Sequence, residues 1–400
     1  MIAQQAHPIW QSMLRVLGTA GTVIAATAIA GSAAIALGAY WSALPYVGTG
    51  GPFAFSLFAP HMVLVPLLAT AWMIALPVRR QLGAKLLIAL GIAAVALSAN
   101  ALWQIMEVAR AEGASISLTD ALDPHDTMMS TPTNRRVEID DGRGGKIALA
   151  IYAPADAGAA PVIVHVHGGA FIGGTHLQRG DDFRWFARQG FATVSIDYSL
   201  SNEGAHHWDT AIAEIGCALA WTAANASEFG GDGSRIVLLG DSAGGNLVLN
   251  AAYRAAAGTL PQSCAGRLPQ IAAVGALYPV VSVADFHDNP IARSSEGAKR
   301  AARLYTGGSP GEFPERYRAT DPVTHLLPQS PPTLIIHGEA DTLVRISDAR
   351  WLVERAEEIG APVRLISLPF TEHAFDKRAT IGNQLMRQTM AAFFAAQTER

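Results

Sequence analysis

Charged residues are scarce in this 400-residue sequence, above all in its first quarter. Asp, Glu, Lys and Arg make up 16% of the chain, whereas soluble globular proteins contain roughly 25%. So little charge cannot cover the surface of a water-soluble domain, and it predicts a membrane region over residues 1–110, followed by a separate catalytic domain. The charged residues of that region are Arg15, Arg79, Arg80, Lys85, Glu107 and Arg110.

Clustered positive charge and cysteine are also scarce. The formal net charge is -4 and no long run of Lys and Arg occurs, which argues against a nucleic-acid partner, because phosphate binding needs clustered cations. Cys217 and Cys264 have neither CxxC spacing nor neighbouring His pairs, so the sequence indicates no zinc site and no disulfide framework. The pair is compatible with two buried thiols or with one bridge.

Long apolar runs, by contrast, are present at residues 16–41, 55–78 and 86–106. A bilayer core of about 30 Å requires about 20 helical residues at 1.5 Å each, and each run reaches this length. A secretory signal peptide is the alternative for the first run, but its apolar region is typically only about 7 to 15 residues. We therefore predict three transmembrane helices, in contact with membrane lipids.

The positive charges of this region predict its orientation. Arg79, Arg80 and Lys85 lie in the second loop, whereas the loop over residues 42–54 has no charged residue. Cytoplasmic loops carry the excess of Lys and Arg, so the second loop and the N-terminus are expected inside. Everything after Met106 is then expected outside, in a multi-pass protein of the plasma or inner membrane with an extracytoplasmic catalytic domain.

Beyond the membrane region the sequence predicts an α/β fold. Residues 111–134 contain Gly and Pro among polar residues and are interpreted as a linker or N-terminal lid element. Over residues 135–400, Val- and Ile-rich runs alternate with helical patterns, which is typical of a mostly parallel sheet, here of about eight strands, flanked by helices. Residues 282–327 break the alternation and predict a cap insertion. The predicted strands are 136–139, 147–152, 162–166, 192–196, 236–239, 271–277, 333–336 and 363–368, and the predicted helices are 181–189, 207–228, 243–256, 347–359 and 382–398.

One motif points to nucleophilic chemistry. The segment Gly240-Asp241-Ser242-Ala243-Gly244 follows an apolar strand and precedes an apolar helix. A sharp strand-to-helix turn exposes such a serine, and the flanking glycines let neighbouring backbone approach it. The turn also places Ser242 at a helix N-terminus, where backbone N–H groups favour developing negative charge. Ser242 is therefore the predicted nucleophile.

A second motif predicts the oxyanion hole. The strand over residues 162–166 ends in His167-Gly168-Gly169-Ala170. Glycines at this place let backbone N–H groups turn toward a substrate oxygen, and the N–H of Ala243 would add a further donor.

These two motifs carry a resemblance. The chain from about residue 135 to 398 resembles the hormone-sensitive-lipase-like branch of the α/β-hydrolases, on His167-Gly168-Gly169-Ala170 and Gly240-Asp241-Ser242-Ala243-Gly244. The resemblance implies hydrolysis of esters with short to medium acyl chains, without a metal or organic cofactor. Ala170 stands where the family has a third glycine, which keeps the N–H but narrows the space beside the acyl carbonyl. The first 110 residues lie outside the resemblance.

The acid and base are expected downstream of Ser242, because the chain order in this fold is serine, acid, histidine. Asp341, in the loop after the strand at 333–336, matches the family's acid position, with Glu339 as the competing carboxylate. His373 lies between the last strand and the last helix and is the predicted base. The other downstream histidines are His287, His325 and His337, and His337 is expected to be structural.

The remaining polar residues are expected to support the site. His165, His206 and His207 lack a ligand set for a metal, and Asp197, Tyr198 and Asp241 are expected to brace loops. The leading hypothesis is a membrane-anchored serine carboxylic ester hydrolase acting on a small-molecule or lipid ester. An amidase, peptidase or deacetylase of an extracytoplasmic substrate would use the same triad. A catalytically inactive membrane interaction protein is the third alternative.

Overall fold

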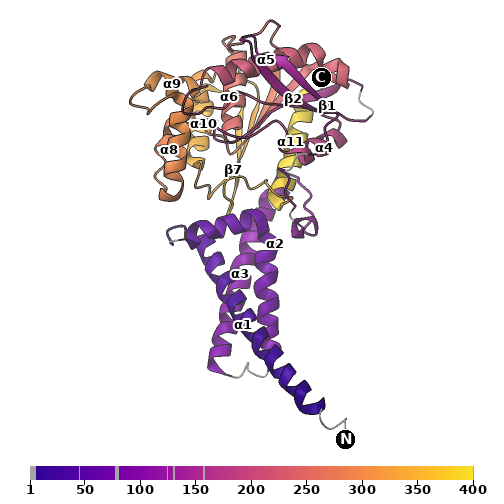
Figure 1. Cartoon of the computed structure of the whole chain (residues 1–400), viewed down its shortest axis with the longest axis vertical. Helices are drawn as coiled ribbons and strands as arrows, with labels where there is room; N and C mark the ends of the chain where they lie inside the picture. The colour runs from indigo at the N-terminus through magenta and orange to yellow at the C-terminus, as the bar shows by residue number, and fades with distance from the viewer. Residues whose placement is uncertain are drawn as a thin grey trace.

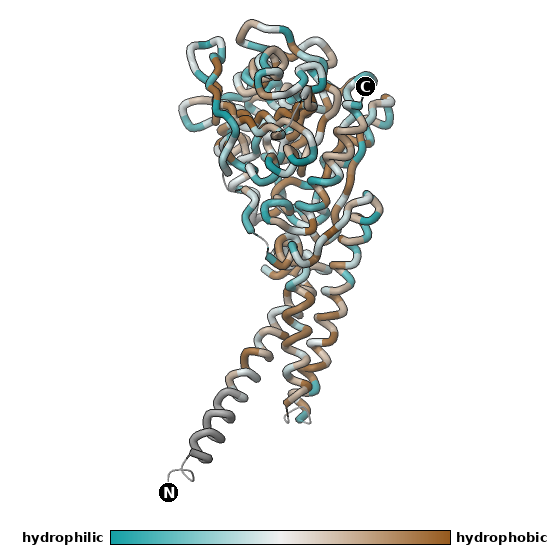
Figure 2. Tube along the Cα trace, turned by 90° about the vertical axis from the view of Figure 1, so that its right-hand side faces the viewer, coloured by the Kyte–Doolittle hydropathy of each residue, from teal (hydrophilic) through white to brown (hydrophobic). Residues whose placement is uncertain are grey.

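The computed structural model describes residues 6–44, 46–76, 81–123, 125–128, 131–155 and 158–399. Three long helices, α1 (Ala6–Tyr40), α2 (Val47–Ala75) and α3 (Leu82–Ala111), form a bundle below a larger α/β part (Figure 1). Within these helices Gly18–Tyr40, Val47–Ala75 and Leu82–Ala111 are long and apolar enough to cross a membrane. Apolar residues run along the described length of the bundle (Figure 2). Val23, Ile24, Leu68 and Leu86 are all more than 60% exposed there.

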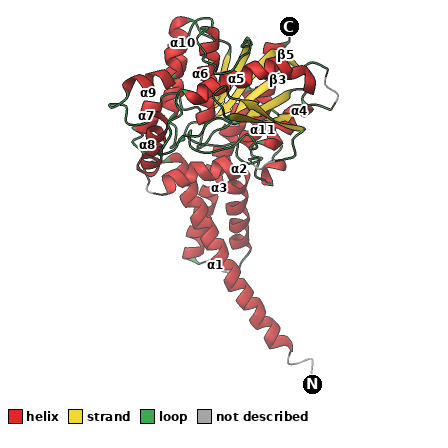
Figure 3. Ribbon diagram, turned by 45° about the horizontal axis from the view of Figure 1, so that its top comes forward, coloured by secondary structure: helices red, strands yellow, loops and turns green. Residues whose placement is uncertain are grey.

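Helix α2 begins earlier than the sequence predicts. Residues 42–54 were expected to form a loop, but α2 starts at Val47 and contains a break at Phe58, where φ is -141° and ψ is 29°. Pro60 explains the break, because a proline inside a helix has no N–H and its ring clashes with the preceding turn. Residues 47–57, called here the α2 arm, lie across the top of the bundle beneath the α/β part (Figure 3). Arg79 and Arg80, on which the predicted orientation depends, lie outside the described residues.

The α/β part is built on one eight-stranded sheet in the order β1-β2-β4-β3-β5-β6-β7-β8. β1 pairs antiparallel with β2, and β2 pairs antiparallel with β4. The remaining neighbours in the sheet, β4-β3-β5-β6-β7-β8, all pair parallel. This confirms the predicted mostly parallel sheet. The strands are β1 (Arg135–Asp140), β2 (Lys146–Tyr152), β3 (Ala160–Val166), β4 (Ala192–Ile196), β5 (Gly231–Asp241), β6 (Ile271–Leu277), β7 (Thr333–Gly338) and β8 (Val363–Leu368).

Side chains alternate between the two faces of the sheet, as strand geometry requires. In β5, Ile236 and Leu238 pack into the core on one face, and Val237 and Leu239 into the core on the other. The first core includes α5 (Thr210–Asn225), α6 (Ala243–Ala256) and α10 (Ile346–Ile359). The second includes α4 (Gly180–Arg188) and α11 (Ile381–Thr398). Helices therefore cover both faces of the sheet (Figure 3). Each of the two cores contains apolar residues of the predicted strands.

The predicted insertion after β6 is helical. It contains α7 (Val283–His287), α8 (Ala292–Thr306), α9 (Pro314–Thr320) and a 3-10 turn at Pro322–His325. Tyr305 of α8 stacks on Phe171, with ring centroids 3.9 Å apart. Because Phe171 directly follows Ala170, this contact brings the insertion against the loop after β3.

The segment between α3 and β1 lies along α11. The side-chain amides of Gln384 and Gln388 bond the backbone of Ser117 and Ser115 in both directions, at 2.8–3.0 Å. The segment also contains a short 3-10 turn, Asp120–Leu122. These bonds fix the end of the three-helix bundle to the last helix of the α/β part.

Candidate active site

Ser242 occupies the turn between β5 and α6. Its φ of 54° lies in the left-handed region that L-residues rarely adopt, and its N–H donates to the carbonyl of Leu277 at 2.9 Å. A Cβ on Gly244 would lie 2.0 Å from the carbonyl oxygen of Val166, so only glycine lets α6 approach β3 this closely. The turn is therefore held from both neighbouring strands, with Ser242 itself 8% exposed.

His373 lies in the loop between β8 and α11, and the fold brings it to Ser242. Its Nε2 is 3.1 Å from the Ser242 Oγ, and its Nδ1 is 2.7 Å from Oδ2 of Asp341. Asp341 comes from the loop after β7. Three loops at the carboxyl edge of the sheet thus assemble a serine, an imidazole and a carboxylate in hydrogen-bonded order.

The Asp341 carboxylate is fully buried, and both of its oxygens accept hydrogen bonds. Its Oδ1 accepts the backbone N–H groups of Leu343 at 2.9 Å and Val344 at 2.8 Å. Burial alone would raise the pKa of Asp341, but the charge and hydrogen bond of His373, together with a hydrogen bond from His337, lower it. Burial likewise works against charge on His373, yet the Asp341 carboxylate raises the pKa of His373 above its usual value. The Asp341 carboxylate therefore stabilises the protonated His373 imidazole that forms when Ser242 gives up its proton.

The alternative acids and bases lie elsewhere. The Glu339 carboxylate is exposed and is 3.7 Å from Arg350. His337 is buried and contacts Oδ2 of Asp341 at 3.2 Å and the carbonyl of Val344 at 2.9 Å, so it supports the acid. His287 bonds its neighbour Asp288, and His325 bonds the carbonyl of Ala319.

The loop after β3 lies beside the nucleophile. A Cβ on Gly168 would lie 3.2 Å from the Cβ of Ser242, which puts the Gly168 backbone against the serine. Gly169 has a φ of 122° and Ala170 a φ of 54°. Within the described part of the chain, the N–H groups of Gly168, Gly169 and Ala170 donate to no protein acceptor. Ala243 begins α6, so its N–H is one of the free donors of a helix N-terminus.

A buried ion-pair network beneath Ser242 was not foreseen from the sequence. Arg179 is 1% exposed and is ion-paired with Asp376, and its Nε lies 3.9 Å from Oδ1 of Asp241. Burial acts against the Asp241 charge, but Arg179 and a hydrogen bond from His165 lower the pKa of Asp241 to about 2. Tyr278 donates to Asp376 at 2.6 Å and packs its ring 4.5 Å from that of His373.

His165 and Tyr198 are also buried near the site. His165 bonds Ser195 at 3.0 Å and Asp241 at 3.2 Å, and burial lowers the pKa of His165. Tyr198 stacks on His167 with ring centroids 4.5 Å apart. Among the described residues no group of three or more His, Cys, Asp or Glu side chains converges as metal ligands would.

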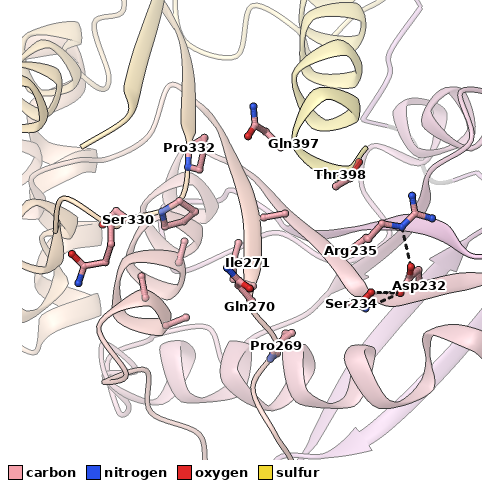
Figure 4. A pocket seen from close by; sticks show the side chains of 16 residues that line it. Asp232, Ser234, Arg235, Pro269, Gln270, Ile271, Ser330, Pro332, Gln397 and Thr398 are labelled. Carbon is pink, nitrogen blue, oxygen red and sulfur yellow. Dashed lines mark hydrogen bonds and ion pairs between the residues drawn. The ribbon is translucent and has the colours of Figure 1, made fainter. Parts of the chain in front are cut away.

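A large surface hollow is separate from this site. A cavity of about 1030 Å³ is lined by Asp232 and Arg235 of β5, Ile271 of β6 and Pro332 just before β7 (Figure 4). These residues lie at the amino ends of parallel strands, whereas Ser242 follows the carboxyl end of β5. The hollow is therefore at the opposite edge of the sheet.

Part of the sequence is similar to known proteins. The sequence matches the BD-FAE family over residues 149–355, just over half of the chain. It is 31% identical over 221 residues to esterase LipC of Mycobacterium tuberculosis, covering 54% of this chain and 53% of LipC. It is 40% identical over 97 residues to human hormone-sensitive lipase, covering 24% of this chain and 9% of the lipase. The chain spans about half the length of the mycobacterial relatives that it matches.

Solved structures share the fold. An esterase from the archaeon Pyrobaculum calidifontis superposes with a TM-score of 0.56 at 24% identity, covering 66% of this chain and 84% of that one. A truncated carbohydrate esterase from gut microbiota gives a TM-score of 0.55 at 21% identity, covering 69% and 99%. On the match over residues 149–355 and this shared fold, the chain belongs to the BD-FAE family, in the hormone-sensitive-lipase-like branch of the α/β-hydrolases.

Proposed function

We propose that this protein is a serine carboxylic ester hydrolase, with Ser242 as nucleophile, His373 as base and Asp341 as acid. The observation that carries the proposal is the continuous hydrogen-bonded order from Ser242 Oγ through both ring nitrogens of His373 to Asp341. An imidazole in contact with a serine on one side and a buried carboxylate on the other is the arrangement that activates a hydroxyl. The names of the mycobacterial and human relatives agree with ester substrates.

The reaction follows from these contacts. His373 Nε2 takes the Ser242 proton as Oγ attacks the ester carbonyl carbon, while Asp341 stabilises the imidazolium. The carbonyl oxygen becomes an oxyanion facing the free N–H groups of the loop after β3 and of Ala243. His373 then gives its proton to the leaving alkoxide, which departs as an alcohol. Water, deprotonated by His373, releases the acyl group as a carboxylic acid and restores the serine.

The substrate is an ester of short to medium acyl length presented at a membrane surface. The loop that carries His373 packs on the helix bundle, with the ring centroid of Phe370 4.7 Å from that of Tyr40 and 6.3 Å from that of Phe55. The edge of the sheet that carries Ser242 therefore faces the bundle and not away from it. Trp41 and Tyr46, exposed in the turn between α1 and α2, are the residue types found at membrane interfaces.

The three helices anchor the catalytic domain on the extracytoplasmic side. The charge distribution around Arg79, Arg80 and Lys85 favours this orientation. A disulfide between Cys217 and Cys264 favours it independently, because such bonds persist in oxidising compartments. A reporter enzyme that is active only in the cytoplasm, fused to the C-terminus, should give no signal, and a strong signal would reverse the orientation.

The catalytic proposal is tested with Ser242→Ala in the full-length protein in detergent micelles. We expect wild type to hydrolyse p-nitrophenyl acetate through octanoate and to react with a fluorophosphonate probe. The variant should lose both, with kcat falling by about 10⁴-fold or more. Ser234→Ala, at the opposite edge of the sheet, is the matched control and should keep both. A folded wild type that cleaves p-nitroanilide amides but no ester would overturn the ester assignment.

A further inference from the structure

Ser56 links the membrane region to the loop of the catalytic base. It lies in the α2 arm and is 4% exposed. Its hydroxyl donates to the carbonyl of Pro52 at 2.9 Å and accepts the backbone N–H of Glu372 at 2.6 Å. Both roles of the hydroxyl are therefore used, and one of them fixes the residue directly before His373.

Glu372 in turn ties together the loops of the acid and the base. Its Oε2 accepts the backbone N–H of His373 at 2.6 Å, and its Oε1 accepts the N–H of Thr342 at 3.1 Å and also the Thr342 hydroxyl. Thr342 directly follows Asp341. One buried carboxylate thus bridges the two loops whose side chains make the 2.7 Å contact between His373 and Asp341.

Aromatic packing fixes the start of the same loop. Phe370 has a φ of 57°, a conformation that is strained for a non-glycine residue and persists only where its surroundings impose it. The surroundings here are Tyr40 at the end of α1 and Phe55 in the α2 arm. Phe55 is 1% exposed and belongs to a small apolar core that also contains Ile105 of α3 and Ile381 at the start of α11.

The shape of the arm has its own physical cause. The break at Phe58 turns residues 47–57 away from the direction of the rest of α2 (Figure 1). A Cβ on Gly51 would lie 2.3 Å from the Ala39 nitrogen, so glycine at this position lets the arm rest directly on the backbone of α1. The arm is thereby braced from below, while its upper side supports the loop of His373.

We infer that the α2 arm is a positioning element of the active site, and that Ser56, through Glu372, sets the place of the His373 imidazole relative to Ser242 and Asp341. This inference rests on the proposed ester hydrolysis by Ser242. It makes the membrane region part of the catalytic apparatus as well as its anchor. Displacing reacting groups by about 1 Å can cost about 10²-fold in rate, so loosening this support should lower kcat.

The test compares three single variants of the full-length protein in detergent micelles, with p-nitrophenyl butyrate as substrate. Ser56→Ala removes the acceptor, Ser56→Thr keeps it, and Ser98→Ala is the matched control. Ser98 is also a buried serine of the bundle, but its hydroxyl has no hydrogen-bond partner within the described residues. We expect Ser56→Ala to lower kcat about tenfold at unchanged KM, Ser56→Thr to restore most of it, and Ser98→Ala to behave as wild type.

A second pair of variants tests the bridge itself. Glu372→Gln should lower kcat and also shift the acid limb of the pH profile to lower pH, because the Glu372 charge raises the pKa of His373. Glu339→Gln, an exposed carboxylate of the acid loop, should change neither. An active wild type with Ser56→Ala within twofold of its kcat would overturn the inference, as would an equal loss in Ser98→Ala. An inactive, folded wild type would instead refute the proposed function.

Discussion

Oδ2 of Asp341, whose side chain is buried, lies 2.7 Å from Nδ1 of His373, whose side chain is 13% exposed. The backbone of Leu343 and Val344 holds the other oxygen of the carboxylate. Burial alone would lower the pKa of His373, and the Asp341 charge reverses this effect and raises it. The acid therefore sets both the tautomer and the basicity of the imidazole.

Replacing Asp341 by Asn should separate these two effects. Activity needs neutral His373, so kcat/KM of the wild type should fall as the pH drops through a pKa above the usual 6.5. Asp341→Asn removes the largest of the charges that raise the pKa of His373 and leaves burial opposed only by the smaller effects of Glu372 and Asp241. The acid limb should therefore move to lower pH, while kcat falls about 10⁴-fold because the tautomer is wrong. The measurement is kcat/KM of both proteins between pH 5 and 9. An acid limb that stays in place would show that another group titrates.

The buried guanidinium of Arg179 should matter for stability more than for chemistry. Arg179→Met removes the partner of Asp376 and Asp241 and leaves their carboxylates in a dry interior, which costs about 3–5 kcal/mol at pH 7. Burial already raises the pKa of Asp376 in the wild type, and losing Arg179 should raise it further. The folded variant then binds more protons than the unfolded chain, so its stability falls as pH rises through that raised pKa.

Chemical denaturation of Arg179→Met at pH 5 and pH 7.5 measures this effect. The loss in free energy of unfolding relative to wild type should be clearly smaller at pH 5, where Asp376 is more often protonated. Arg135→Met is the control, since Arg135 pairs with Glu228 on the surface and both side chains are about half exposed. An equal deficit at both pH values would mean that the network does not depend on the charge of Arg179.

The strands, the helices on both faces and the residues of local motifs could be predicted from the sequence. Ser242 lies between an apolar strand and an apolar helix, and that order is visible in the chain itself. The network around Arg179 was missed because its partner Asp376 is 197 residues away, and only the fold brings them together. The α2 arm was missed because its glycines are typical of a loop, whereas Gly51 packs closely on the backbone of α1.

Ala170 is held at a φ of 54°, where alanine is strained and glycine is not. Ala170→Gly should relieve this strain, which stabilises the fold, but it also raises the conformational entropy of the unfolded chain, which destabilises the fold. The free energy of unfolding should therefore change by less than about 1 kcal/mol. The lost methyl group widens the space beside the acyl carbonyl. We expect kcat/KM for tert-butyl acetate to rise relative to n-butyl acetate.

Ala159 offers a matched control for this substitution. It has a φ of 63° and precedes β3 at the end opposite to Ala170. Ala159→Gly makes the same chemical change in the same backbone region and should leave the substrate ratio unchanged. If both variants alter the ratio alike, the effect comes from general loosening and not from space at Ala170.

The disulfide between Cys217 of α5 and Cys264 joins positions 47 residues apart, with Cα atoms separated by 5.5 Å. Closing a loop of this length restricts the unfolded chain, and the chain-entropy estimate for the stabilisation is about 4 kcal/mol as an upper value. The double variant Cys217→Ser/Cys264→Ser should therefore unfold at clearly lower denaturant concentration. A reductant should lower the midpoint of wild type toward that of the variant and leave the variant itself unchanged. Protein extracted from the membrane without reductant should resist maleimide labelling after unfolding. Full labelling of both cysteines would contradict the bridge. The disulfide would then no longer support an extracytoplasmic catalytic domain.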